Sequence, residues 1–283
     1  MEEPMRDRTR AIIMAGGAGL AALGLWTLFG GASDTDRDAG YPPLDRPKPI
    51  ADDVWVVDSG PINAMGLTLP VRMTIVRLAN GDLILHSPTR YSDEVAAAIA
   101  ELGTIRHLVA PNVAHWTFIA DWQRACPETT MWAVPGLAER AQVRASGLRI
   151  DHELGETPPA IWSGVLQQGI VAGAAGFTET WFFHRPSRTL IVGDLIENLE
   201  PDKLPPIQRL LMRAAAATRG TTARYLRVPV RLGGQAARAS VRAMIALRPE
   251  RVIFAHGTIF ETDGTARLAR AFDWLVDNDD RMM

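Results

Sequence analysis

The chain has 283 residues, of which 47% are hydrophobic and 22% charged. This composition supports a large buried core and excludes a disordered chain, a collagen-like repeat and a disulfide-stapled miniprotein. The 30 basic and 32 acidic residues leave a net charge of −2, which gives no sign of a nucleic-acid partner, and the single Cys126 excludes an internal disulfide and a Cys-rich zinc module.

The first element is an apolar segment, residues 11–31, which carries no charge. As a helix rising ~1.5 Å per residue it spans roughly 31 Å, about the thickness of a bilayer core. Because Arg6, Arg8 and Arg10 precede it, the positive-inside rule predicts a cytoplasmic N-terminus (1–10) and an extracytoplasmic main domain. We therefore expect a single-pass transmembrane anchor in contact with membrane lipid.

A cleaved signal peptide is the alternative to this anchor. Gly30 and Ala32 are small residues at a loosely matching cleavage site, and cleavage there would give a secreted protein. Residues 32–50 follow with many Asp and Pro residues, which predicts a semi-extended linker. The remainder, residues 51–283, is predicted to be one α/β domain.

Short β-favouring runs and longer helical patterns alternate along this domain. The expected strands are 54–58, 71–78, 83–87, 105–110, 131–134, 164–172, 179–184, 189–193 and 251–255. The expected helices are 93–102, 115–125, 135–145, 206–217, 235–247 and 264–276. Asn80-Gly81-Asp82 predicts a hairpin turn, and Ser92 is the expected N-cap of the first helix.

Three polar residues follow apolar strands directly or within a few residues. They are His115, Asp194 and His256. Strand ends are where α/β folds present their ligands, so we expect the three side chains to converge at one sheet edge. Two imidazoles and a carboxylate suit one divalent metal ion, with zinc preferred over iron or manganese, and leave positions open for water.

Three stretches of the chain resemble the metallo-β-lactamase-like superfamily. GFTETWFFHRPSRTLIVGDLI (176–196) is similar to the strand, turn and strand that end in the family's metal-binding Gly-Asp, and VIFAHGT (252–258) is similar to the segment of its last metal-binding His. VRMTIVRLANGDLILHSP (71–88) resembles its opening hairpins. The resemblance covers the whole soluble domain and implies an αββα four-layer sandwich with Asp194 and His256 as metal ligands.

The chain departs from this family at several ligand positions. The family's H-x-H-x-D-H loop is replaced by PNVAHW, in which His115 is the one histidine. The family's Asp at the end of the early hairpin is also replaced, and His86 lies near that position. The His ahead of the Gly-Asp strand is also missing, with Glu179 the nearest polar residue. The pattern is similar to a degenerate branch of the superfamily, a domain of unknown function, and implies a mononuclear site.

The candidate residues have distinct expected roles. His115, Asp194 and His256 are the metal ligands, and Asp194 is also catalytic because it orients the attacking water. His86 and Asn112 are expected to orient a ligand or water, and Glu179 to serve as a further ligand or general base. For each of them, a turn, cap or surface role is the structural alternative. The other three histidines, His107, His152 and His184, are expected to be structural.

The segment 203–249 contains ten basic residues and no acidic one. Beside a bilayer such a segment attracts anionic headgroups, and its amphipathic start predicts an interfacial or lid helix. The expected contacts with lipid or an anionic substrate are Arg209, Arg213, Arg219 and Arg224. A solvated basic face is the alternative.

Two functions follow from these features. The first is a membrane-anchored, metal-dependent hydrolase that acts on a small-molecule ester, amide or phosphoester, in which the metal lowers the pKa of bound water towards ~7. The second is a metal-free, membrane-tethered binding or scaffold module. A nucleotide cofactor is not expected, because the one glycine-rich run lies inside the apolar segment 11–31 with no strand before it.

Overall fold

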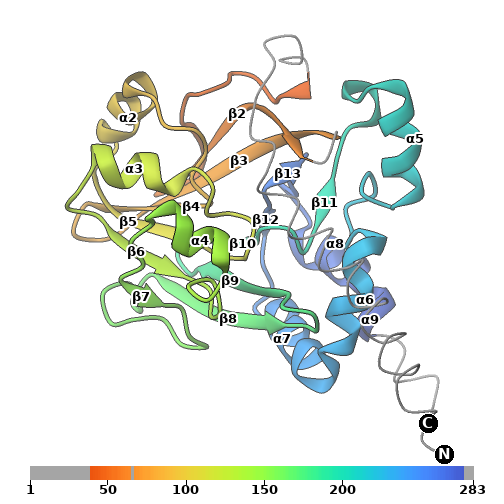
Figure 1. The fold of residues 1–283 in the computed structure, drawn as a ribbon. Helices are drawn as coiled ribbons and strands as arrows, with labels where there is room; N and C mark the ends of the chain where they lie inside the picture. Colours follow the sequence, from red (N-terminus) through yellow and green to blue (C-terminus); the bar gives the residue numbers. More distant parts are fainter. Residues whose placement is uncertain (1–38, 65–66, 277–283) are drawn as a thin grey trace, which may run out of the picture.

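The computed structural model of the chain describes residues 39–64 and 67–276 (Figure 1). The predicted cytoplasmic N-terminus and transmembrane anchor, residues 1–31, lie outside these described residues. Within the described ranges, no helix is long and apolar enough to cross a membrane.

The first sheet has seven strands in the order β1-β2-β3-β4-β5-β6-β7. Its strands are β1 (Lys48–Ala51), β2 (Val54–Ala64), β3 (Leu67–Arg77), β4 (Asp82–His86), β5 (Thr104–Ala110), β6 (Thr130–Ala133) and β7 (His152–Glu153). Neighbours are antiparallel from β1 to β4 and parallel from β4 to β7. The predicted Asn80-Gly81-Asp82 turn joins β3 to β4, and Gly81 has the positive φ of 86° that this turn needs.

The second sheet has four strands in the order β12-β10-β9-β8, and β11 and β13, which follow β10 and β12 in the chain, form a separate two-stranded pair. The strands are β8 (Leu166–Ala172), β9 (Thr178–His184), β10 (Thr189–Ile191), β11 (Glu197–Asn198), β12 (Arg251–Ile253) and β13 (His256–Gly257). The pairs β10–β12 and β11–β13 are parallel. These two parallel pairs bring the segments around Asp194 and His256 together.

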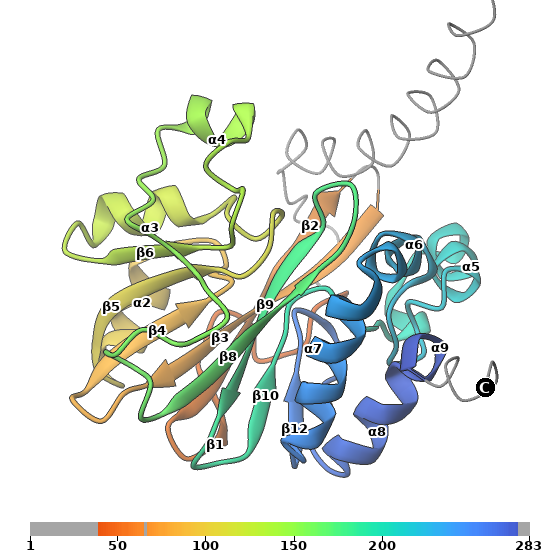
Figure 2. The ribbon, with the colours of Figure 1, turned by 90° about the horizontal axis from the view of Figure 1, so that it is seen from below.

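Helices cover the outer faces of both sheets (Figure 2). They are α2 (Asp93–Ala100), α3 (Ile119–Ala125), α4 (Ala141–Ser146), α5 (Pro206–Ala214), α6 (Arg224–Leu232), α7 (Gly234–Ala246), α8 (Gly264–Ala271) and α9 (Asp273–Val276), with a 3₁₀ helix at Pro201–Lys203. In Figure 2, α2 and α3 lie against the first sheet, and α7 and α8 lie against the second. The chain therefore has the α, β, β, α order of layers that the sequence predicts.

Side chains alternate between the two faces of each strand, so three apolar interfaces join the layers. Ile75 and Leu85 pack towards α2 and α3. Their neighbours Val76 and Ile84 point to the other face and meet Phe182 and other side chains of the second sheet. On the far side of that sheet, a separate apolar cluster joins its strands to α7 and α8.

The linker predicted for residues 32–50 ends earlier than expected. Lys48–Ala51 form β1 and pair with β2 in an antiparallel register. The proline-rich sequence predicted a semi-extended linker here, and the extended segment with Pro49 is tolerated as a strand because β1 is the edge strand of its sheet, where a missing N–H donor can be accommodated.

Two predicted helices begin later than expected. The helix predicted for 115–125 begins at Ile119, because the Asn112 side chain accepts the backbone N–H groups of Ala114 and His115 and turns the chain there. The helix predicted for 135–145 begins at Ala141, because Gly136 has a positive φ of 83° that interrupts the helical path.

Two further elements differ from the sequence prediction. Helix α6 was not predicted, and it contains Pro229, a residue that normally argues against a helix interior. The helix expected over 264–276 is divided, since α8 ends at Ala271 and α9 begins at Asp273. The remaining predicted elements are present, most of them within about two residues of their expected ends, including α2 with Ser92 Oγ accepting from Val95 N.

Candidate metal centre

His115, Asp194 and His256 converge at the strand ends, as the sequence predicts. His115 Nε2 lies 3.0 Å from Asp194 Oδ1, and His256 Nε2 lies 3.1 Å from the same oxygen. The two imidazole rings are nearly perpendicular, at 80°, with centroids 5.5 Å apart. One ligand atom from each residue lies within 4.8 Å of the others, so the three can share one ion.

His256 has a fixed tautomer that bears on this arrangement. Its Nδ1 lies 2.7 Å from the carbonyl oxygen of Pro70, which can only accept, so Nδ1 carries a proton. A neutral His256 therefore directs the lone pair of Nε2 at a carboxylate oxygen of Asp194. That contact is favourable when His256 is protonated or when a cation lies between the two atoms.

The charge balance of the cluster is consistent with this contact. Burial by itself lowers the pKa of His256, but the hydrogen bond and negative charge of Asp194 outweigh it and raise the pKa. Burial opposes ionisation of Asp194, yet His115 and His256 hold its pKa well below the usual range. Asp194 is therefore anionic at neutral pH, although its side chain is buried.

His115 is oriented by Ser87, which follows β4. Ser87 Oγ lies 2.7 Å from His115 Nδ1, and a hydroxyl can donate or accept, so Nε2 can face Asp194 or a metal. Ser87 has a positive φ of 54°, an uncommon conformation for a residue other than glycine. Such strain is held where the surrounding structure fixes it, which is frequent at functional sites.

Asn112 connects the His115 loop to the carboxylates. Its Nδ2 group donates to Asp194 Oδ2 at 3.0 Å and to Glu179 Oε2 at 3.1 Å, while its Oδ1 accepts the N–H groups of Ala114 and His115. The amide thus holds the second oxygen of Asp194 and leaves Oδ1 to the histidines. This is the orienting role expected for Asn112 from the sequence.

Glu179 holds the backbone around Asp194. It is fully buried and accepts hydrogen bonds from the backbone N–H groups of Gly193, Asp194 and Leu195. Burial, and then the charge of Asp194, raise the pKa of Glu179 to about 7. Its two oxygens are occupied by these donors and by Asn112, so it fixes the position of Asp194 and is not among the three ligands that converge.

The two glycines beside the ligands are required by close approach. A Cβ on Gly193 would lie 2.8 Å from Asn112 Nδ2 and 3.1 Å from Glu179 Oε2. Gly257 has a φ of 100°, and a Cβ there would lie 2.1 Å from the carbonyl oxygen of Asn198. The Gly-Asp and His-Gly pairs of the sequence therefore have a structural cause.

Arg72 holds the strand end that carries His256. Its Nη1 donates to the carbonyl oxygens of Phe254 and Gly257, at 2.9 and 2.7 Å, which lie on either side of His256. Its Nη2 pairs with Asp58 at 2.7 Å, and both side chains are buried. Arg72 thus fixes the backbone around His256 and brings a positive charge close to the site.

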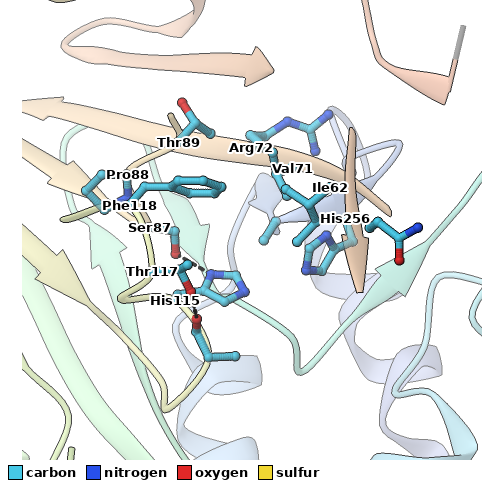
Figure 3. Close-up of a pocket in the computed structure, with 13 residues that line it drawn as sticks. Ile62, Val71, Arg72, Ser87, Pro88, Thr89, His115, Thr117, Phe118 and His256 are labelled. Atoms are coloured by element: carbon cyan, nitrogen blue, oxygen red, sulfur yellow. Dashed lines mark hydrogen bonds between the residues drawn. The ribbon is translucent and has the colours of Figure 1, made fainter. Parts of the chain in front are cut away.

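A small pocket opens beside the two histidines, with a cavity volume of about 50 Å³ (Figure 3). Figure 3 shows the rings of His115 and His256 at its wall, with Phe118, Ile62 and Val71 around them. The lining combines these apolar side chains with Arg72, Ser87 and Thr89. The pocket can therefore admit an apolar group next to the polar cluster.

The remaining histidines lie apart from the cluster. His86 is buried against Phe182 and, within the described residues, forms no hydrogen bond to His115, Asp194 or His256, so no direct contact supports its expected orienting role. Burial, followed by His115, lowers its pKa to about 3. His107 contacts Trp132 and Trp162, His152 stacks near Trp132, and His184 contacts Ser187, as expected for structural residues.

The four predicted anion-contact arginines do not line the pocket. Arg209 is half-buried and pairs with Asp202 at 3.5 Å, while the other three are exposed on or between α5 and α6. The pocket itself draws its positive charge from Arg72, a buried residue inside an ordinary strand pattern that sequence reasoning missed. Ser87 was missed too, although it is the last residue of a predicted strand and precedes Pro88.

Glu197 is a second buried carboxylate that the sequence did not single out. It pairs in register with His256 through β11 and β13, and the Tyr225 hydroxyl donates to its Oε1. Burial raises the pKa of Glu197 to about 7. Its signal in the sequence is its place three residues after Asp194 at a strand end.

The donor set fits a divalent metal ion. Two ligand atoms bound to one zinc ion at about 2.0–2.1 Å lie about 3.0–3.4 Å apart, close to the contacts that both histidines make with Asp194 Oδ1. Each His also has its other nitrogen held by an oxygen, the usual way to orient a metal-binding imidazole. Three protein ligands with open positions are typical of catalytic rather than structural zinc.

Comparison with known proteins gives one family match. The family model described as "Domain of unknown function (DUF4336)" matches residues 51–228. No curated protein sequence matches the chain.

Several solved structures have a similar fold. TMB-1 has a TM-score of 0.56 and 14% identity over 85% of this chain and 100% of that chain. The DIM-1 metallo-β-lactamase exposed to ceftazidime has a TM-score of 0.55 and 13% identity over 83% and 97%. FIM-1 from Pseudomonas aeruginosa, a metallo-β-lactamase in its mono-zinc form, has a TM-score of 0.53 and 15% identity over 84% and 98%. The chain therefore has a metallo-β-lactamase-like fold.

Proposed function

This chain belongs to the DUF4336 family, and from its fold and its convergent ligands we propose that it is a metal-dependent hydrolase with a mononuclear site. The proposed substrates are small-molecule esters, amides or phosphoesters, and zinc is the preferred metal. The observation that carries the proposal is the approach of both His Nε2 atoms to one oxygen of Asp194, with the proton of His256 fixed on Nδ1.

The chemistry divides between the metal and the chain. A bound zinc ion would polarise the scissile group and supply a hydroxide-like nucleophile at neutral pH. His115, Asp194 and His256 would hold it. Asn112 keeps Asp194 Oδ2 occupied, so Oδ1 alone faces the histidines. Ser87 and Pro70 keep the imidazoles turned towards that oxygen.

The surroundings suit a substrate with an apolar portion. The pocket beside the histidines is lined by Ile62, Val71 and Phe118, with Thr117 at its edge. Its small volume favours a compact group over a bulky one. The buried guanidinium of Arg72 adds a positive field that favours charge developing on a substrate oxygen.

A hydrolysis screen tests the proposal. The full chain is assayed with zinc, manganese or iron(II) on chromogenic carboxylic esters, anilides and phosphodiesters, alongside His256→Ala and the matched control His184→Ala. The proposal expects turnover in the parent and the control, with loss of at least about a hundredfold in His256→Ala and on chelation. Equal turnover in His256→Ala, or none in the parent with any metal on any substrate class, contradicts it.

We also propose the membrane location expected from residues 11–31. Support comes from the length of the uncharged segment and the three arginines before it. Protease digestion of intact spheroplasts tests it: an extracytoplasmic domain is cleaved from outside while the short N-terminus stays protected. A domain that is protected until the cells are lysed, or one that is released without its N-terminal segment, contradicts a retained anchor with this orientation.

A further inference from the structure

Helix α5 turns its apolar stripe away from the protein. Ile207, Leu210 and Leu211, at i, i+3 and i+4, are 51–78% exposed. On a helix of a globular protein, this stripe normally faces the core. Here the inward face carries Gln208, whose side chain accepts from the backbone N–H of Thr68 and donates to its carbonyl oxygen, at 2.9 and 2.6 Å. These bonds fix the helix with its apolar face outward.

Helix α6 repeats this arrangement. Tyr225, Val228 and Leu232 are 48–68% exposed, while Leu226 and Val230 pack in the core. The two helices lie on the same side of the molecule in Figures 1 and 2, and the backbone of Arg224 donates to the carbonyl of Ala215 where they meet. Six large apolar side chains are thus exposed on consecutive helices, a feature typical of interaction surfaces.

The charged residues on α5 and α6 themselves are all arginines, and the nearby Asp202 pairs with Arg209. Arg213, Arg219 and Arg224 are exposed, and none of them has an ion pair with a described carboxylate. The pKa of Arg227 is lowered first by burial; Asp273 acts against this, but the neighbouring Arg224, Arg231 and Arg219 lower it further. The arginines therefore lie close enough to repel one another, and an anionic partner would relieve that repulsion.

We propose that α5 and α6 form a docking surface for an anionic lipid bilayer. The exposed aliphatic side chains of α5 and α6 enter the boundary between headgroups and acyl chains, while the Tyr225 hydroxyl stays bonded to Glu197. Arg213, Arg219 and Arg224 contact lipid phosphates. A second copy of this chain fits poorly, because a self-complementary contact would place the same arginines against each other. The bilayer satisfies both the apolar stripes and the exposed arginines.

The test uses the full chain with Cys126→Ser and one new labelling position at a time. Leu210→Cys and Val228→Cys carry a polarity-sensitive fluorophore on the docking surface. Ile161→Cys is the matched control, because Ile161 is also an exposed apolar residue, at 51%, but lies before β8. Each protein is reconstituted into vesicles of phosphatidylcholine alone or with one third phosphatidylserine.

The proposal expects emission from the labels at 210 and 228 to shift to shorter wavelength in the phosphatidylserine vesicles, and the label at 161 to stay unchanged. High salt weakens the shift. Replacing Arg213, Arg219 and Arg224 by Glu in the labelled proteins removes it, since each lost cation lowers binding about fivefold. Equal emission in both vesicle types overturns the proposal, and a shift that grows with protein concentration without lipid assigns the surface to a second copy instead.

Discussion

The strand-end cluster (Ser87, Asn112, His115, Asp194 and His256) buries its polar groups, whereas the α5–α6 surface exposes its apolar ones. At the cluster, polar groups from β13 and from the segments after β4, β5 and β10 are hydrogen-bonded to one another. On the α5–α6 surface, apolar side chains face outward, and Arg213, Arg219 and Arg224 form no ion pair with a described carboxylate.

This difference separates two kinds of candidate site. The cluster is organised by its own chain, because Asn112, Glu179 and Arg72 fix its geometry without any ligand. Changes to these residues should therefore cost folding stability as well as function. The α5–α6 surface contributes little to the fold through its outward side chains, so changes there should affect binding alone.

The largest stability effect is expected at Arg72. Arg72→Met leaves the buried Asp58 with the half-buried Lys48 as its cation partner and frees the carbonyls of Phe254 and Gly257. We expect a loss of about 3–5 kcal/mol in the free energy of unfolding, measured by urea denaturation. Arg213→Met, on the α5–α6 surface, is the control and should change it by less than about 0.5 kcal/mol. Similar losses in the two variants would remove the distinction between the regions.

Asn112→Ala should have the next largest effect. Without its Nδ2 group, the carboxylates of Asp194 and Glu179 lose their shared donor, and the N–H groups of Ala114 and His115 lose their acceptor. We expect a loss of about 1–3 kcal/mol in the free energy of unfolding, measured by urea denaturation. Asn80→Ala, in the exposed hairpin turn, is the control and should lose less. An unchanged urea-unfolding midpoint for Asn112→Ala would mean that the hydrogen bonds of Asn112 do not hold Asp194 in place.

The pH dependence of stability tests the burial of His86. Its pKa is about 3 in the folded chain against about 6.5 unfolded, so the unfolded chain binds the proton first as pH falls. The His86 contribution to stability is therefore full above pH 6.5 and decreases below it, by about 1.4 kcal/mol per pH unit down to the folded pKa. Subtracting the pH profile of His86→Leu from that of the parent should give this slope between pH 6 and 4. A zero difference would show that His86 is accessible to protons.

The smallest effect is expected at the outward face of α5. Leu210→Ser removes an exposed apolar side chain, so the free energy of unfolding should change by no more than about 0.5 kcal/mol. Leu204→Ser, a buried residue just before the same helix, is the control and should lose several times more. A large loss in Leu210→Ser would indicate that this side chain packs against the rest of the chain.

Much of this arrangement was predictable from local pattern. Strand ends identified His115, Asp194 and His256. The parallel pairs β10–β12 and β11–β13 bring Asp194 and His256 together, and Asn112 links the His115 loop to Asp194. The resemblance of 176–196 and 252–258 to a known superfamily supplied the order of the layers. Asn112 was expected as an orienting residue from its place in the same loop.

Other features depend on contacts between distant segments and were not predictable. Arg72 reaches across the fold to carbonyls about 180 residues later in the chain, and nothing in a β-strand pattern marks that contact. Ser87 depends on an uncommon backbone conformation. The amphipathic start of 203–249 predicted an interfacial or lid helix, but the bonds between Gln208 and Thr68 that hold α5 with its apolar stripe outward join segments 140 residues apart.

The most direct test of the metal centre is the metal content of the purified full chain after incubation with zinc, iron or manganese and removal of free ion. The account predicts about one metal ion per chain in the parent and in His184→Ala, and almost none in Asp194→Ala or His256→Ala. A parent that retains no metal, or an Asp194→Ala variant that retains as much as the parent, would contradict it.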